Sequence, residues 1–438
     1  MRSSRPLNLL IISNIISGFA QGISMLAIPW YFVSILHSPE KLTLMYMLTL
    51  VGSVFWGLYS GTLIDKYARK SIFLFFSLIG GIILCGASLT GFLYDTGVPT
   101  YIVVIVFMAT AYINTIYYPA LYAFAQEVSE PSRYGKVNSL LEIQSQAMTI
   151  ASGGVGAILL QGIDINAIHI PMSFGGISIP ISLHIARWSL SRIFMVDGLT
   201  YFVAIALIAM VKYAPHIEKH KVEGSVWERF KTGNAFLKSH PLVLIFGISS
   251  LSIFVFLLLH FNTLVPIYIV NHLHSNVTIY ALTDVFYAIG ALLAGVWVRQ
   301  IFRNVNTVKA ILILISITWV TLTICALSTS NAIYFAFSFM LGVTNAGARV
   351  LRITYLFHHV PNNLIGRVNS VLFMLGTLWR LGLAMIFSLA FFSEGDNVTW
   401  ALLICVLFLL LNFIMLAINY KGLTTKYPDL SLDASVKS

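Results

Sequence analysis

The sequence predicts an all-α membrane protein of twelve transmembrane helices, arranged as two pseudo-symmetric six-helix bundles. Of its 438 residues, 58% are hydrophobic and only 10% are charged, whereas soluble domains carry about 25% charged residues. A helix needs about 20 apolar residues to cross a bilayer. The twelve expected spans are 7–36, 42–63, 71–94, 100–125, 139–161, 191–211, 242–270, 277–298, 308–328, 331–357, 368–392 and 399–420.

The positions of the 26 lysine and arginine residues predict the orientation of the chain. With the N-terminus inside, nearly all of them fall in cytoplasmic loops, and only Lys41, Arg187 and Arg192 lie outside. Cytoplasmic loops of membrane proteins carry such an excess of positive charge. We therefore expect both termini in the cytoplasm and the protein in the plasma membrane. The net charge of +10 then reflects topology and implies no nucleic-acid partner.

Internal repeats predict the division into two halves. Residues 29–38 match 266–275, and the stretch 135–139 matches 366–370. Parallel repeats related by an axis along the membrane normal place a binding site between them near the midplane. The expected parts are an N-terminal bundle at 1–211, a cytoplasmic linker at 212–240, a C-terminal bundle at 241–420 and a cytoplasmic tail at 421–438.

Two connecting segments carry patterns of their own. In the linker, Ser225-Val-Trp-Glu228 has the spacing of a capping box, and the residues after it can form a short amphipathic helix, either a membrane-surface strut or a loosely packed linker helix. In the outer connection, isoleucines alternate around Phe174-Gly175-Gly176. This pattern favours a small extracellular β-hairpin at 163–183 over an irregular loop.

A loop motif, Gly61-Thr-Leu-Ile-Asp65-Lys66-Tyr-Ala-Arg69-Lys70, packs four charges between two apolar stretches. It resembles the signature between helices 2 and 3 of the major facilitator superfamily, which consists of transporters. Residues 118–120, 135–140 and 197–202 are similar to the drug- and siderophore-exporting branch, which includes macrolide-efflux and enterobactin-exporter proteins. The resemblance covers most of the chain and implies the major facilitator fold, a monomer and transport by alternating access.

The resemblance also implies roles for the residues of this motif. In the family, the aspartate pairs with a partner helix end or an arginine to latch the inner gate, so Asp65 is the expected latch. Gly61 lies on the same helix face, where a missing side chain permits close helix approach, and Ser53 and Gly57 continue that face. The alternative is that the basic residues only fix topology. The expected inner-gate residues are Gly61, Asp65, Lys66, Arg69 and Lys70.

A glycine cluster in the predicted span 139–161, comprising Gly153, Gly154 and Gly156, resembles the glycine-rich antiporter motif of exporters. Glycine clusters allow helices to bend and to pack closely. Either bending during transport or tight packing alone explains the cluster.

Ionisable side chains inside predicted spans are costly in a membrane, so each is a candidate functional residue. Arg380 and Asp284 lie deep in their spans, and we expect both to face the central cavity, where they pair or contact substrate. Glu142 lies nearer the inner surface and is either a cavity residue or a snorkelling end residue. Arg349 and Arg352 are either gate partners or cations that complement a helix C-terminus.

Uncharged polar residues and histidine extend the set of candidates. Those expected to contact substrate or to form interhelical hydrogen bonds are Gln21, Asn14, Asn114, His260 and Asn262. Proton coupling needs a carboxylate or a histidine whose pKa is moved toward the working pH. Asp284, Glu142 and His260 are the candidates for that role.

These features predict a secondary active transporter that exports an amphipathic small organic molecule, of drug or siderophore type, against a proton gradient. Uptake, or transport of a lipid or anionic solute, is the alternative; a transport-dead sensor or a membrane-embedded enzyme is less favoured. The chain has no His-Glu-x-x-His zinc motif and no Gly-x-x-x-x-Gly-Lys phosphate loop. We therefore expect no enzyme activity, no cofactor and no metal, with a small-molecule substrate, protons and the lipid bilayer as partners.

Asp65→Asn is expected to loosen the outward-facing state, because the second half has Arg299 in the equivalent place and keeps no carboxylate there. Arg299→Gln is expected to matter less. Labelling of a cysteine introduced at the inner helix ends with a membrane-impermeant thiol reagent measures the effect. Equal effects of the two substitutions would contradict a latch at Asp65.

Overall fold

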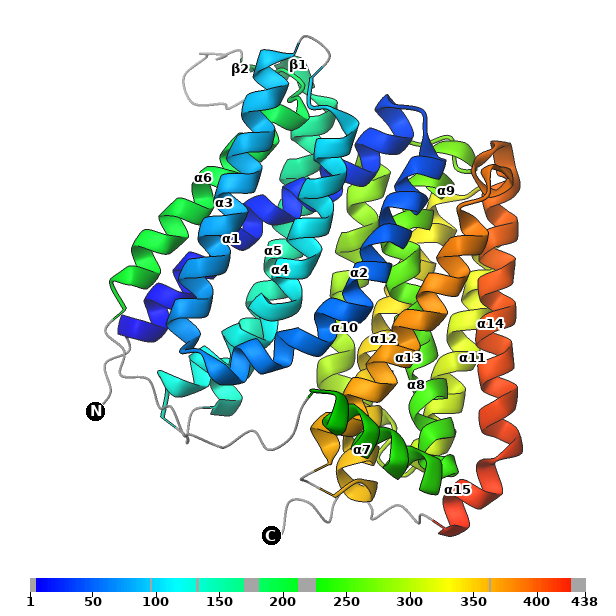
Figure 1. Ribbon diagram of the computed structural model, residues 1–438. Coiled ribbons are helices and arrows are strands. Elements are labelled where there is room, and N and C mark those ends of the chain that lie inside the picture. The colour runs from blue at the N-terminus through cyan, green and yellow to red at the C-terminus, as the bar shows by residue number, and fades with distance from the viewer. Residues whose placement is uncertain are drawn as a thin grey trace, which may run out of the picture.

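The computed structural model describes residues 5–94, 97–130, 134–168, 181–211, 226–361 and 364–426. It is almost entirely helical and forms an N-terminal and a C-terminal bundle that lie side by side (Figure 1). The N-terminal bundle contains α1 (Arg5–Trp30) with a π-helical extension η1 (Tyr31–Ile35), α2 (Pro39–Lys66), α3 (Arg69–Leu93), α4 (Thr100–Glu127), α5 (Tyr134–Gln161) and α6 (Leu190–Ala209).

The C-terminal bundle is built in the same way. It contains α8 (Pro241–Leu259), a π-helical turn η3 (His260–Leu264), α9 (Val265–Asn271), α10 (Val277–Ile301), α11 (Thr307–Ala326), α12 (Asn331–His359), α13 (Ile365–Phe387) and α14 (Val398–Ile418). Two short 3₁₀ turns, η4 (Ala390–Ser393) and η5 (Gly395–Asn397), precede α14, and a short helix α15 (Tyr420–Lys426) follows it.

Two strands mark one end of the molecule, which we call the hairpin end (Figure 1). β1 (Ile163–Ile168) pairs antiparallel with β2 (Ile181–Ile185). The glycine turn expected between them lies outside the described residues, so the extracellular hairpin as a unit stays a prediction. The linker helix α7 (Val226–Ser239) lies at the opposite end, which we call the α7 end (Figure 1).

The membrane character of the chain is clear from its helices. Within the part of the chain that the structure describes, ten helical segments are long and apolar enough to cross a membrane. The long helices α2 and α12 are not among those ten. An integral membrane protein is therefore confirmed, while the full count of twelve spans stays a prediction.

The internal repeat extends to the backbone conformation. His37 and His274 occupy equivalent positions of the repeated stretch, and both adopt the left-handed conformation with φ of 48°. Such a conformation is uncommon for a residue other than glycine. The same unusual turn therefore ends the first helix of each half.

The linker helix α7 packs against the C-terminal bundle. The side chain of Leu237 is 1% exposed and belongs to an apolar cluster with Val243, Leu356 and Val371. Trp227, at the start of the helix, stays 58% exposed. The apolar side of this helix is thus used largely for packing on α8, α12 and α13.

Helices α10 and α12 approach each other most closely where two glycines meet the facing backbone. A Cβ atom added at Gly290 would collide with the carbonyl oxygen of Phe339, and one added at Gly342 would collide with that of Tyr287. Small residues at helix interfaces allow this approach in membranes, where apolar burial between helices gains little.

The small residues expected along one face of α2 differ in how closely other helices approach them. At Gly57 no atom lies within 4 Å of the place a Cβ would take, and the residue is exposed. The close approach on this helix occurs at Gly52 instead, against the hydroxyl group of Tyr112 in α4. The expectation of close packing at Gly57 is therefore wrong for this conformation. The surroundings of Gly61 and the side chain of Asp65 lie outside the part of the structure that is described.

Gly290→Ala is expected to lower the free energy of unfolding by about 1–3 kcal/mol, because the new methyl group meets a backbone atom that cannot move aside. Gly295→Ala, on the same helix with open space around it, is the matched control and is expected to be neutral or slightly stabilising. Thermal unfolding of the purified protein in detergent measures both. Equal melting temperatures for the two variants would contradict the tight contact.

Candidate functional site

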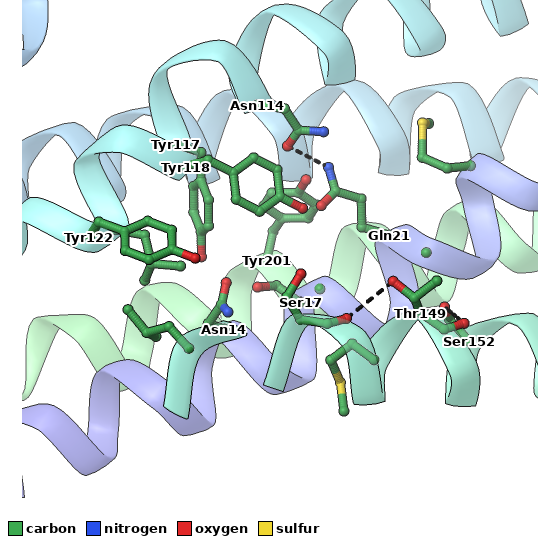
Figure 2. Close-up of a pocket in the computed structure, with 17 residues that line it drawn as sticks. Asn14, Ser17, Gln21, Asn114, Tyr117, Tyr118, Tyr122, Thr149, Ser152 and Tyr201 are labelled. Carbon is green, nitrogen blue, oxygen red and sulfur yellow. Dashed lines mark hydrogen bonds between the residues drawn. The ribbon is translucent and has the colours of Figure 1, made fainter. Parts of the chain in front are cut away.

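Four helices of the N-terminal bundle enclose a polar cavity of about 220 Å³ (Figure 2). Its walls come from α1, α4, α5 and α6. The lining side chains with hydroxyl or amide groups are Asn14, Ser17, Gln21, Asn114, Tyr117, Tyr118, Tyr122, Ser145, Thr149, Ser152 and Tyr201. The remaining walls are formed by glycine, methionine and leucine. We call this space the polar cavity.

An amide pair closes one side of the polar cavity. The Gln21 amide donates to the Asn114 side-chain oxygen at 2.8 Å, which joins α1 to α4 (Figure 2). Ser17, one turn before Gln21 on α1, lies beside the hydroxyl group of Tyr117 on α4. The Asn14 amide has no hydrogen-bond partner among the described residues. Three of the polar residues predicted to contact substrate or to form interhelical hydrogen bonds, Gln21, Asn114 and Asn14, therefore lie together in this cavity.

The tyrosines of α4 form the aromatic wall of the polar cavity. Tyr117 and Tyr118 contact each other edge to face with ring centroids 6.2 Å apart. The side chain of Tyr118 remains 46% exposed although it lies in the middle of a helix. Figure 2 shows Tyr117, Tyr118 and Tyr122 along one side of the space and Asn14 on the other.

Sequence reasoning missed these aromatic residues, although their spacing could have revealed them. Asn114, Tyr117, Tyr118 and Tyr122 follow one another at three- and four-residue intervals on α4, and such intervals place side chains on one helix face. A polar face on a helix that is otherwise apolar indicates a wall of a cavity or an interhelical contact.

Glu142 connects the polar cavity to the opposite bundle. Its carboxylate accepts hydrogen bonds from Tyr122 at 3.4 Å and from Gln146 at 3.2 Å. It also forms an ion pair with Arg349 of α12, with 3.2 Å between Nη2 and Oε1. The two charged side chains are 37% and 49% exposed. Glu142 and Arg349, which were predicted separately, thus form one contact across the two bundles.

Arg352, the other predicted gate partner, has a different place. Its side chain is buried, and its guanidinium donates to the carbonyl oxygen of Ser250 at 3.1 Å. This bond joins α12 to α8 within the C-terminal bundle. Arg352 therefore forms a hydrogen bond within the C-terminal bundle, whereas Arg349 forms an ion pair between the two bundles.

Asp197 lies behind the polar cavity. It is 1% exposed, and one carboxyl oxygen accepts a hydrogen bond of 2.6 Å from Ser24 on α1. The other carboxyl oxygen has no partner among the described residues. Tyr201, one turn further along α6, lies near this carboxyl group and lines the polar cavity.

Asp284 and Arg380 are not partners in this conformation. No ion pair joins them among the described residues, and neither lines the polar cavity. The guanidinium of Arg380 donates to Thr377 of its own helix at 2.8 Å and lies beside the hydroxyl group of Tyr46 on α2. Asp284 lies on α10 among tyrosines, including Tyr280 and Tyr334.

The two predicted residues of η3, His260 and Asn262, make contacts within the C-terminal bundle. His260 is fully buried, with Nε2 3.4 Å from the Tyr334 hydroxyl group and an aromatic ring from Phe256 stacked on it. The Asn262 amide donates to the carbonyl oxygen of Leu258, one turn earlier, at 2.7 Å. His260 therefore belongs to the core of the C-terminal bundle.

The basic residues of the loop motif hold neighbouring helix ends. Lys70 donates to the carbonyl oxygens of Ala209 and Val211 at 2.8 Å each, where α6 ends. The Arg69 guanidinium lies 3.7 Å from the carboxylate of Glu127 at the end of α4. Exposed carbonyl groups at a helix C-terminus favour a nearby cation. Lys66 is exposed and lies over the Tyr67 ring.

The glycine cluster of α5 contacts two other helices. Gly156 faces Leu26 and Ile23 of α1, whereas Gly153 faces the carbonyl oxygen of Ala281 on α10. Gly154 faces open space. This cluster therefore lies where α5 packs between α1 of its own bundle and α10 of the other, and the space for a Cβ atom is tight at Gly156 alone of the three.

Contacts between the bundles are concentrated at the hairpin end. The rings of Trp30 and Tyr280 stack with centroids 5.9 Å apart, and Thr278 donates to the Gln161 side chain at 2.7 Å. Along the face of α2 that meets α13, Tyr46 is buried, but Gly57 is exposed. Figure 1 shows α2 leaving the C-terminal bundle toward the α7 end. The bundles are thus closed together at the hairpin end and diverge toward the α7 end.

The comparison with known families agrees with this architecture. The sequence model of the Major Facilitator Superfamily matches residues 10–382. The chain belongs to the major facilitator superfamily. No curated protein matches its sequence at a significant level.

Solved structures share the fold of this superfamily member at low sequence identity. The nucleoside transporter NupG is 11% identical, with a TM-score of 0.67 over 95% of this chain and 99% of that one. A bacterial homologue of the iron transporter ferroportin, in an inward-facing state, is 15% identical, with a TM-score of 0.63 over 95% and 99%. A bacterial homologue of the human lysosomal transporter Spinster, inward-facing and unoccupied, is 11% identical, with a TM-score of 0.66 over 94% and 97%. At such identities the likeness establishes the fold.

Reversing one charge of the Glu142–Arg349 pair is expected to open the α7 end further. Glu142→Arg places two guanidinium groups together, and the double variant Glu142→Arg with Arg349→Glu restores the attraction. Half-exposed pairs contribute about 0.2–1 kcal/mol, so a population shift of roughly two- to fivefold is expected. Pulsed electron paramagnetic resonance between spin labels at the α7 ends of α5 and α12 measures the distance distribution. A double variant as open as the single one would contradict the pairing.

Proposed function

We propose that this protein is a secondary active transporter of twelve spans, which moves a small organic solute across a membrane by alternating access. The polar cavity is the observation that carries the proposal. Polar walls inside a membrane protein are costly unless they serve a ligand, a partner or water. The two bundles, whose contacts are concentrated at the hairpin end, provide the gate that such a mechanism needs.

The divergence at the α7 end supports an inward-facing state. Basic residues gather at that end, including Lys66, Arg69 and Lys70, and the positive-inside rule assigns that end to the cytoplasm. Both termini would then be cytoplasmic and the strands extracellular. Alternating access would require the stack of Trp30 on Tyr280 to separate when the α7 end closes.

The proposed latch follows from the same geometry. Asp65 ends α2 at the α7 end, close in sequence to Arg69 and Lys70, which hold α3 to the ends of α4 and α6. When the bundles close, a charge at the end of α2 would lie next to helix ends that Arg69 and Lys70 already hold together. In this state α2 and α13 are apart at that level, so a latch would form only in the outward-facing state.

The direction of transport is proposed as efflux, on the resemblance of the loop motif and of the α4–α5 region to the exporting branch. Uptake is the alternative. Solved structures of similar fold include a nucleoside transporter, a homologue of an iron transporter and a homologue of a lysosomal transporter. Their different cargoes favour no single cargo for this chain.

Proton coupling is proposed to use a carboxyl group within the membrane. Asp284 is the first candidate, because its described surroundings contain tyrosines and no cation partner. Glu142 is the second, because its partners Tyr122 and Arg349 lie on different bundles and separate as the bundles move. His260 is a weaker candidate, since it is buried in the core of one bundle.

Asp284→Asn is expected to abolish flux driven by an imposed pH gradient, because the amide cannot carry the proton, while exchange of solute between the two sides continues. Proteoliposomes with the purified protein and radiolabelled drugs, siderophores and sugars measure both. Glu394→Gln, an exposed change at the hairpin end, is the control and is expected to leave both rates unchanged. Intact gradient-driven flux in Asp284→Asn would transfer the role to Glu142, and the absence of any flux in the native protein would contradict transport itself.

A further inference from the structure

We propose that the polar cavity binds an uncharged solute of modest size that carries a planar ring together with hydroxyl or amide groups. The inference rests on the proposed transport function and names the chemical class of its substrate. It narrows the amphipathic drug or siderophore expected from the sequence, and it opposes an anionic solute.

The charge of the solute follows from the walls of the polar cavity. No lysine, arginine, histidine, aspartate or glutamate is among its described lining residues. A charged group that leaves water without a counter-charge loses several kcal/mol of hydration energy. A charged solute would pay that cost here, and an uncharged solute would not.

The acidic groups nearest to the polar cavity are held by other residues. Glu142 lies behind Tyr122 and is engaged by Arg349 and Gln146. Asp197 is 1% exposed and is covered by Ser24 on the side of α1. Neither carboxylate reaches the space where a cationic solute would lie.

The hydrogen-bonding groups left open in the polar cavity are of both kinds. After the Gln21–Asn114 bond, the side-chain oxygen of Gln21 can still accept and the amide of Asn114 can still donate. Asn14 offers both a donor and an acceptor and has no described partner. A solute with hydroxyl or amide groups supplies both functions and satisfies polar atoms that are otherwise costly to enclose.

The aromatic wall and the volume set the shape of the solute. Tyr118 presents a ring that is 46% exposed beside Tyr117 and Tyr122, and such rings favour stacked or edge-on contact with another planar group (Figure 2). A cavity of about 220 Å³ is smaller than the range of about 300–1,000 Å³ typical of drug-sized ligands. A single ring with a few polar substituents fits these limits.

Thermal unfolding of the full-length protein with matched ligands tests the proposal. Each series keeps one scaffold and changes its charge: benzyl alcohol, benzylamine and benzoate; uridine, its amine at the ribose end and its monophosphate; glucose, glucosamine and glucuronate. A ligand that binds the folded state raises the melting temperature with concentration. We expect stabilisation by the uncharged member of a series with a planar ring, benzyl alcohol or uridine. We expect none by its charged relatives.

A charge placed in the wall provides the second arm of the test. Gln21→Glu keeps the shape of the side chain and adds a carboxylate, and it is expected to weaken binding of the uncharged ligand roughly tenfold and to strengthen that of the amine. Gln300→Glu, the same change at an exposed position of α10 outside the polar cavity, is the matched control and is expected to leave both affinities as they are. Folding of each variant is checked by its melting temperature without ligand.

The outcomes separate the substrate class from the transport function. Stabilisation mainly by the amine or the acid, or no stabilisation by any uncharged ring compound, would overturn the proposed class. Proteoliposome flux of a charged solute would overturn the class and leave transport standing. Binding of the uncharged ligand to Gln21→Glu with unchanged affinity would also overturn it, because the ligand would then lie elsewhere.

Discussion

The structure depends on one constraint, which is that hydrocarbon offers no hydrogen bonds to a polar group. The backbone meets this constraint by forming helices, in which every amide is satisfied within its own segment. Many serine and threonine side chains do the same by donating to the carbonyl oxygen one turn earlier, as Thr49, Thr263 and Thr318 do. Helices then associate where small residues let backbones meet, most closely at Gly290 and Gly342.

Against this background, the polar groups that remain open to the polar cavity stand out. Four helices surround Asn14, the side-chain oxygen of Gln21 and the amide nitrogen of Asn114. These groups form no hydrogen bond with another described residue. In the C-terminal bundle, His260 is packed by aromatic rings and its Nδ1 has no partner among the described residues, whereas Asn262 bonds to its own helix. The two halves share a repeated sequence, and the polar cavity described above lies in the first of them.

The kinds of contact between the two bundles bear on how the bundles can move. Contacts between the bundles at the hairpin end are apolar stacking and hydrogen bonds, whereas an ion pair between Glu142 and Arg349 spans them nearer the α7 end. An ion pair of partly exposed groups is weak and easily exchanged for water, so it can break and form at small cost. Glu142 also accepts a hydrogen bond from Tyr122, a wall residue of the polar cavity, so one side chain contacts both the cavity wall and the opposite bundle.

Much of the architecture could be predicted from the sequence because helix periodicity, apolar length and charge asymmetry are local properties. The membrane class and most helix positions follow from them, and the superfamily was expected from the resemblance of its loop motif. Residues such as Gln21 and Asn114 were recognised as polar groups on apolar helices. The distribution of the candidates could not be predicted in this way. Asp284 and Arg380 lie apart, and His260 is enclosed in a core, because the rotation of each helix about its axis is set by packing against its neighbours.

The sequence by itself determined that this chain is helical, lies in a membrane and consists of two related halves, since each of these depends on composition and repetition along the chain. Only the tertiary structure decided which polar residues meet. It joined Glu142 to Arg349 across 207 positions of sequence, and it placed tyrosines of α4 opposite Asn14 of α1 in a cavity whose described lining has no charged side chain. Such pairings depend on how helices cross and rotate, and that geometry is fixed by side chains that meet from distant parts of the chain.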